Sequence, residues 1–78
     1  MTTRTPSIRS SAALGRVLRR AREQQGLTQA EVAAKADTTR WAVLNLEAGR
    51  ETAAMRTLFE LTAALGLEIT VRGISDGS

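Results

Sequence analysis

The sequence predicts a small all-α domain of four to five helices, followed by one short C-terminal β-strand. Three observations lead to this fold class. Apolar residues recur at helical spacing in four stretches, Ser or Thr stands before these stretches and Gly follows most of them, and only residues 67–72 alternate apolar and polar residues strongly, as a strand does. With 78 residues, the chain makes one domain near the lower size limit for a self-sufficient core.

The first helix is predicted to begin after a polar, flexible arm formed by residues 1–10. Ser10 or Ser11 serves as its N-cap, and Gly26 marks its end. The helical pattern is carried by four apolar residues at positions i, i+3, i+4 and i+7, namely Leu14, Val17, Leu18 and Ala21.

Two short helices with a tight turn between them are predicted next. Thr28 and Glu31 form a capping box at the start of the first, which runs from Gln29 to Ala36. The turn is Asp37-Thr38-Thr39, and Thr39 caps the second helix, from Arg40 to about Glu47. This spacing is that of a helix-turn-helix. The small Ala33 is expected where the two helices cross, with Val32, Val43 and Leu46 facing inward. The alternative is an ordinary helical hairpin.

A fourth helix and a strand complete the prediction. The helix is carried by Met55, Leu58, Phe59, Thr62 and Leu65 and ends at Gly66. The strand covers residues 67–72, and an isolated strand leaves its backbone groups unpaired. We therefore expect it to pair with its copy in a second subunit through Leu67, Ile69 and Val71. The alternatives are pairing with residues 5–8 of the same chain, or fraying.

The predicted organisation is therefore an arm (1–10), a helix-turn-helix domain (11–66), a dimerisation strand (67–72) and a tail (73–78). Since the chain has no Cys and no His, disulfides are excluded, and a zinc or haem site has almost no ligands. We expect no metal and no cofactor. A chain of this size has a small core, so it needs a further source of stability, and formation of a homodimer is the simplest one.

Basic charge is concentrated at the N-terminal end of the chain. Residues 1–22 carry six Arg and no acidic residue, whereas the rest carries five basic and eight acidic residues. This asymmetry is typical of a polyanion-binding protein, although a solvated tail would look the same. No stretch resembles a signal peptide or a membrane span, so a cytoplasmic, nucleoid-associated protein that does not contact membranes is expected.

At this point the residues resemble a known family. The chain is similar to Xre/Cro/C1-type helix-turn-helix domains in the order of its characteristic residues. These residues are Leu18, Arg22, Gly26-Leu27-Thr28-Gln29, Val32-Ala33, Val43, Leu46-Glu47, Gly49-Arg50, Leu58, Leu61 and Leu65-Gly66. The resemblance implies a lambda-repressor-like bundle. A fourth helix followed at once by Leu-Glu-Ile-Thr-Val is similar to HipB-type antitoxins. Such antitoxins pair C-terminal strands across a dimer, repress their own operon and bind a HipA-type kinase toxin.

The resemblance implies roles for several residues in the helix-turn-helix. Thr28 and Gln29 match the pair that contacts phosphate, although both also fit pure capping. In the second helix of the motif, the recognition helix, the outward side chains are expected to be Thr39, Arg40, Trp41, Leu44 and Asn45. Arg40 would read guanine and Asn45 would contact adenine or phosphate.

Arginines outside the recognition helix are expected to contact the DNA backbone or to support the scaffold. The expected backbone contacts are Arg50 together with Arg16, Arg19 or Arg20, while Arg22 is expected to pair with Glu47.

Asp37 stands where the family usually has Gly, and Asp tolerates the left-handed conformation. Trp41 and Leu44 cannot donate to phosphates. Recognition of the DNA sequence would then depend more on contact with thymine methyl groups and on DNA shape. Alternatively, Trp41 packs against a neighbouring helix or a partner protein.

The function predicted from the sequence is a sequence-specific DNA-binding repressor that acts as a homodimer on a palindromic operator, as the antitoxin of a HipBA-like pair. One alternative is a solitary Xre-type regulator. Another is a protein-interaction module that keeps the fold and docks through Trp41 and Leu44. An enzyme is not expected, because the chain offers no paired carboxylates on a cleft and no Gly-rich phosphate loop.

Overall fold

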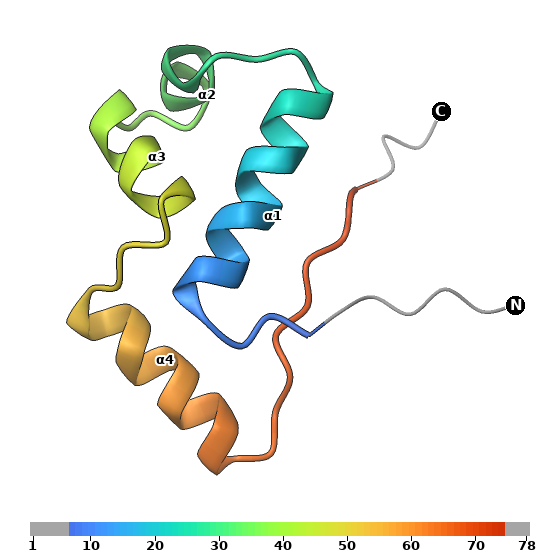
Figure 1. Ribbon diagram of the computed structural model, residues 1–78, viewed down its shortest axis with the longest axis vertical. Helices are drawn as coiled ribbons and strands as arrows, with labels where there is room; N and C mark the ends of the chain where they lie inside the picture. The colour runs from blue at the N-terminus through green and yellow to red at the C-terminus, as the bar shows by residue number, and fades with distance from the viewer. Residues whose placement is uncertain (1–6, 75–78) are drawn as a thin grey trace, which may run out of the picture.

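The computed structural model describes residues 7–74 and contains four helices (Figure 1). They are α1 (Ser11–Gln24), α2 (Gln29–Lys35), α3 (Arg40–Glu47) and α4 (Ala53–Ala64). The all-α prediction is confirmed, with four helices in this range. No helix of residues 7–74 is long and apolar enough to cross a membrane.

Local capping fixes where each helix begins. The N-cap side chain accepts a hydrogen bond from the backbone N–H three residues on, and these N-caps are Ser10, Thr28, Thr39 and Thr52. Three helices are followed closely by a glycine with positive φ, at Gly26, Gly49 and Gly66. The short-range signals in the sequence therefore place the helix boundaries correctly to within two residues.

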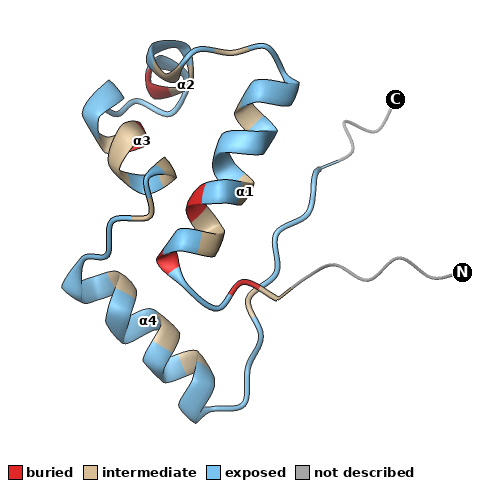
Figure 2. Cartoon of the chain, viewed as in Figure 1, coloured by how far each residue is buried: buried red, intermediate tan, exposed pale blue. Residues whose placement is uncertain are grey.

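The core lies where α1 and α2 pack against α3. Ala33 of α2 and Val43 of α3 are buried, and Gly15 and Ser11 are the buried residues of α1 (Figure 2). No side chain in the described part of the chain is fully buried. The expectation that Leu46 faces inward is wrong in this chain, because its side chain is 42% exposed. At this position α1 approaches the backbone of α3, because a Cβ on Gly15 would overlap the Leu46 carbonyl oxygen.

Helix α4 is joined to this core only loosely. It contains no buried residue and is mostly exposed in Figure 2. Leu58, Leu61 and Leu65, spaced as one face of a helix, are between 44% and 69% exposed. Phe59 and Thr62, on the adjoining side of the helix, line a hollow of about 320 Å³ against Ile8 and Ile69.

The strand predicted over residues 67–72 is not formed in the described structure. In its place is one antiparallel bridge between Ile8 and Ile69, in which the Ile8 N–H donates to the Ile69 carbonyl over 2.7 Å. This is the same-chain pairing named as an alternative, but limited to a single residue pair. Ile8 is buried, so the chain is held at this point, while residues 1–6 of the predicted arm lie outside the described range. One isolated bridge provides too few ladder hydrogen bonds to define a strand.

Candidate nucleic-acid interface

The turn between α2 and α3 is built from local contacts that the sequence predicts. The Glu31 N–H donates to the Thr28 hydroxyl (3.0 Å) and the Glu31 carboxylate accepts from the Thr28 N–H (2.8 Å), so the capping box is complete. Ala33 is only 3% exposed. Asp37 has φ +56°, the left-handed conformation for which glycine is usual. These features hold α2 across α3 in the helix-turn-helix arrangement.

A polar network ties the end of α3 to α1 and α2. The Arg22 guanidinium donates twice to the Glu47 carboxylate, from Nε to Oε2 (2.6 Å) and from Nη2 to Oε1 (2.9 Å). Arg22 also donates to the Leu27 carbonyl over 2.8 Å. The two side chains of this ion pair are 13% and 6% exposed. The ion pair implied by the resemblance is therefore present, and it fixes α3 against α1.

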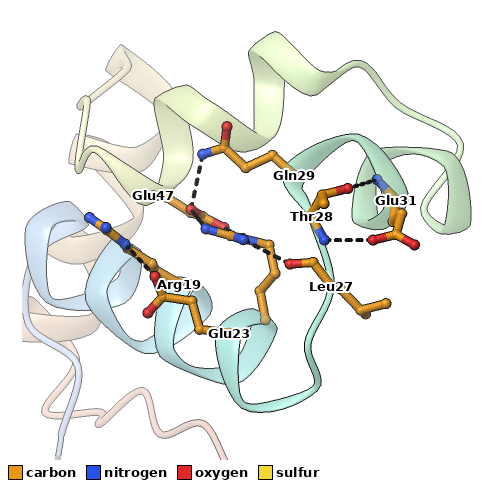
Figure 3. A network of polar contacts seen from close by, with 8 residues as sticks. Arg19, Glu23, Leu27, Thr28, Gln29, Glu31 and Glu47 are labelled. Atoms are coloured by element: carbon orange, nitrogen blue, oxygen red, sulfur yellow. Dashed lines mark hydrogen bonds and ion pairs between the residues drawn. The ribbon is translucent and has the colours of Figure 1, made fainter.

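Gln29 joins the same network. Its amide nitrogen donates to Glu47 Oε1 over 3.1 Å, as Figure 3 shows. In the structure this side chain therefore supports α3 from α2. The Thr28 hydroxyl is likewise occupied by the capping box (Figure 3). Both predicted phosphate-contacting side chains are thus engaged within the protein.

Ionisation of Glu47 is favoured by this arrangement. The hydrogen bond from Arg22 lowers the pKa of the Glu47 carboxyl, burial opposes this, and the Gln29 amide lowers it further. The same hydrogen bond raises the pKa of Arg22. The pair is therefore fully charged near neutral pH.

The outer surface of α3 carries two exposed residues suited to DNA contact. Arg40 is exposed, and Trp41 is 73% exposed. Thr39 is exposed too, but its hydroxyl accepts from the Ala42 N–H as the N-cap. Leu44 is half-buried. This face has a basic and an aromatic side chain at its N-terminal end, where a recognition helix contacts base edges.

Asn45 is held differently from its expected outward position. It is half-buried, its amide nitrogen donates to the Trp41 carbonyl over 2.9 Å, and its Oδ1 is buried with no hydrogen-bond partner among the described residues. This side chain folds back onto its own helix. Its Oδ1 is left without the partner that a buried polar atom normally finds.

Comparison with known families decides how this arrangement is classified. Residues 18–71 match the family model HTH_3, described as helix-turn-helix, and this range covers about two thirds of the chain. The chain belongs to this HTH_3 helix-turn-helix family. A search of curated proteins found no match. Family membership makes the chain a DNA-binding transcriptional regulator of the Xre/Cro type.

Within this HTH_3 domain, three of the predicted DNA-contacting residues line one hollow and the others do not. Arg19, Gln29 and Leu44, from three different helices, line one hollow of about 280 Å³ beside Glu47. Arg19 is exposed there and forms an i,i+4 ion pair with Glu23 over 3.1 Å. Arg50, exposed just beyond α3, does not line this hollow.

One residue that positions the HTH_3 recognition helix escaped the sequence analysis. A Cβ on Gly15 would overlap the Leu46 carbonyl oxygen and lie 2.7 Å from the Glu47 carbonyl oxygen. Gly15 therefore lets α1 contact the end of α3 directly. The signal was available, since a glycine inside a helix is unfavourable and often marks a close approach.

Proposed function

We propose that this chain is a sequence-specific repressor that places α3 in the major groove of double-stranded DNA. The observation that carries the proposal is the exposure of Arg40 and Trp41 on a helix whose inner side is fixed by the Arg22–Glu47 pair. A rigidly held helix with free outward side chains suits base readout. Arg40 is the candidate for bidentate contact with O6 and N7 of guanine.

The remaining predicted contacts take more specific roles in this proposal. Trp41 and Leu44 present apolar surface that suits the thymine methyl group. Asn45 has to release the Trp41 carbonyl before its amide can reach adenine or phosphate. Thr39, Thr28 and Gln29 act first by holding the motif together, and the side chain of Gln29 reaches phosphate only by leaving Glu47.

Arg19 and Arg50 are the proposed contacts to the DNA backbone. Both are exposed, and they lie on α1 and just after α3 respectively. Contacts of this kind supply affinity without sequence preference, and they make binding salt-dependent.

We infer that the working unit is a homodimer on a palindromic operator. In the single chain, Leu58, Leu61 and Leu65 form an exposed apolar stripe on α4, next to the exposed Leu67. Contiguous apolar surface of this kind is rare on monomers and marks an interface. A second copy related by a two-fold axis covers the stripe with the same stripe. The two recognition helices then lie about 34 Å apart, one DNA turn.

The segment 67–72 supplies the second part of the proposed dimer contact. Backbone groups of successive residues in an extended segment point to opposite edges. Ile69 faces Ile8 of its own chain, so Glu68 and Thr70 face the other edge, where no backbone hydrogen bond to them exists within residues 7–74. Pairing of this edge with its copy lengthens the bridge into a strand. Leu67, Ile69 and Val71 then lie together on one face of that sheet.

The finer proposal is that the repressor is the antitoxin of a HipBA-like pair, regulates its own operon and binds a HipA-type kinase toxin. Its support is the resemblance of α4 and the Leu-Glu-Ile-Thr-Val segment to HipB-type antitoxins. Two features of the single chain are consistent with the proposal, namely the free edge of residues 67–72 and the exposed leucines of α4.

The deciding experiment is binding to the DNA directly upstream of the gene itself. Fluorescence anisotropy at two salt concentrations, with a scrambled duplex as competitor, separates specific from non-specific binding. Competitor-resistant binding with a symmetric two-site footprint is expected. Weak binding that scrambled DNA removes equally would argue against a repressor. Co-purification with the product of the neighbouring gene tests the antitoxin proposal, and its failure favours a solitary Xre-type regulator.

Two variants test the parts of this proposal separately. Arg40→Ala should weaken operator binding by about 1–3 kcal/mol and relax the preference at one base pair. Equal losses on every duplex would assign Arg40 to phosphate. Removal of all residues after Gly66 should give monomers by analytical ultracentrifugation, and a dimeric truncated protein would refute strand pairing.

One observation favours a second function. Trp41 is 73% exposed, and Trp is enriched among the residues that anchor protein interfaces. In that case the chain docks a partner protein through Trp41 and Leu44 instead of reading DNA. Competition between the operator and a scrambled duplex distinguishes the two functions, because a docking module with these arginines binds both duplexes equally and only at low salt.

A further inference from the structure

Helix α1 and the C-terminal segment run alongside each other in Figure 1. Residues of both, including 71–73, line a groove of about 690 Å³. Its apolar wall includes Ala13, Val17 and Val71. Three arginines also line it, Arg16, Arg20 and Arg72. The groove therefore combines apolar surface with concentrated positive charge.

The groove lies on the opposite side of α1 from the helix-turn-helix. Gly15 contacts the end of α3, and at about 100° per residue Val17 projects about 200° away from it. Arg16 and Arg20, four residues apart, share the groove side. A ligand in the groove therefore leaves the outward face of α3 accessible.

The positive charge of the groove is not neutralised within the described range. None of its lining residues is acidic. The ion pairs found among residues 7–74 are Arg19–Glu23, Arg22–Glu47 and Arg56–Glu51, and none of these arginines lines the groove. Three like charges that line one groove repel one another and favour a ligand of opposite charge.

We propose that this groove binds an acidic amphipathic segment of a partner protein. Apolar side chains of the segment pack against Val17 and Val71, and its carboxylates pair with Arg16, Arg20 and Arg72. Charge complementarity selects the sign of the partner, and the apolar wall selects a peptide over duplex DNA. DNA offers phosphates along a convex backbone, and its apolar thymine methyl groups lie inside the major groove, where they cannot fill a groove of the protein. Arg16 and Arg20 are thereby assigned to a protein partner and not to the DNA backbone.

The test uses the full chain and a fluorescein-labelled synthetic peptide of Glu, Ala and Leu, about 15 residues long, with leucines on one helical face. Its affinity is measured by anisotropy, and a peptide of scrambled order serves as the control ligand. Arg20→Gln is compared with Arg56→Gln, which removes the same charge from an exposed site on α4 outside the groove. Val17→Thr keeps the side-chain shape and removes apolar surface.

The ordered peptide is expected to bind more tightly than its scrambled form. Arg20→Gln is expected to weaken binding roughly two- to five-fold, Val17→Thr by about three- to ten-fold, and Arg56→Gln by less than either. Unchanged far-UV circular dichroism establishes that the variants fold. Equal binding of the two peptides, equal effects of Arg20→Gln and Arg56→Gln, or displacement of the peptide by a non-operator duplex would each overturn the proposal. The last of these results would make the groove a phosphate site. None of these outcomes depends on operator recognition by α3.

Discussion

Substitution of Gly15 by alanine tests how closely α1 approaches α3. In an isolated helix this change is stabilising by about 1 kcal/mol, because glycine is the poorer helix former. In the folded protein the added Cβ meets the carbonyl oxygens of Leu46 and Glu47, the latter at 2.7 Å. Both are backbone atoms, so relief requires α1 to move away from the end of α3.

The magnitude follows from these opposing effects. An extra carbon in a packed site costs about 1–3 kcal/mol, and the backbone contacts here place Gly15 at the upper end. After the helix-propensity gain, we expect Gly15→Ala to lower the free energy of unfolding by about 2 kcal/mol. A chain of this size has about 4–12 kcal/mol in total, at about 0.05–0.15 kcal/mol per residue. The expected loss is therefore a large share of the total free energy of unfolding.

Urea unfolding followed by far-UV circular dichroism measures this change. The midpoint should fall by about 1–2 M with an unchanged slope. Protein concentration is held constant, because a dimer gains stability with concentration. Gly73→Ala is the matched control, since its Cβ would meet nothing within 4 Å. A Gly15→Ala protein as stable as the parent would refute the close packing of α1 on α3.

Three further predictions concern the supports of the recognition helix. Thr28→Ala should lower the free energy of unfolding by about 0.5–2 kcal/mol, because it removes the N-cap of α2. Thr28→Ser keeps a hydroxyl at the cap and should retain most of this free energy. Equal losses in the two variants would speak against capping. In thermal melts, Asp37→Val should be about 1–2 kcal/mol less stable than Asp37→Gly, because φ is +56° there. Glu47 has a pKa below its ordinary value of 4.5, so its stabilising contribution is present above pH 4.5 and is lost as pH falls through the lower folded-state pKa. In urea titrations, Glu47→Gln should therefore flatten the loss of stability in acid, and an unchanged pH profile would exclude the Arg22–Glu47 pair as its source.

Much of the helix-turn-helix was determined by the sequence alone. Thr28 and Glu31 meet over three residues, and Thr39 caps α3 over the same distance. Such contacts depend only on local backbone geometry, so a short stretch of sequence contains all the information. The position of Ala33 and the left-handed Asp37 follow from the same local pattern.

Other features were decided by tertiary structure. The amide of Gln29 turns to Glu47, because the crossing of α2 and α3 brings residues eighteen apart in sequence within hydrogen-bonding distance. The half-burial of Asn45 is also tertiary, whereas the hydrogen bond from its amide to the Trp41 carbonyl is local and spans four residues. Neither orientation is visible in the helical periodicity, which gives the face of a residue but not its partner.

The C-terminal segment shows the same division. Its alternating pattern indicated a strand, but a strand needs a second segment, and pattern does not specify which. In the single chain Ile8 meets Ile69 and no ladder extends beyond that pair within residues 7–74. The sequence determined the local helix signals, because these act over three or four residues. Tertiary structure decided the close contact at Gly15, the partner of Gln29 and the exposure of the α4 leucines, because these depend on how distant segments cross.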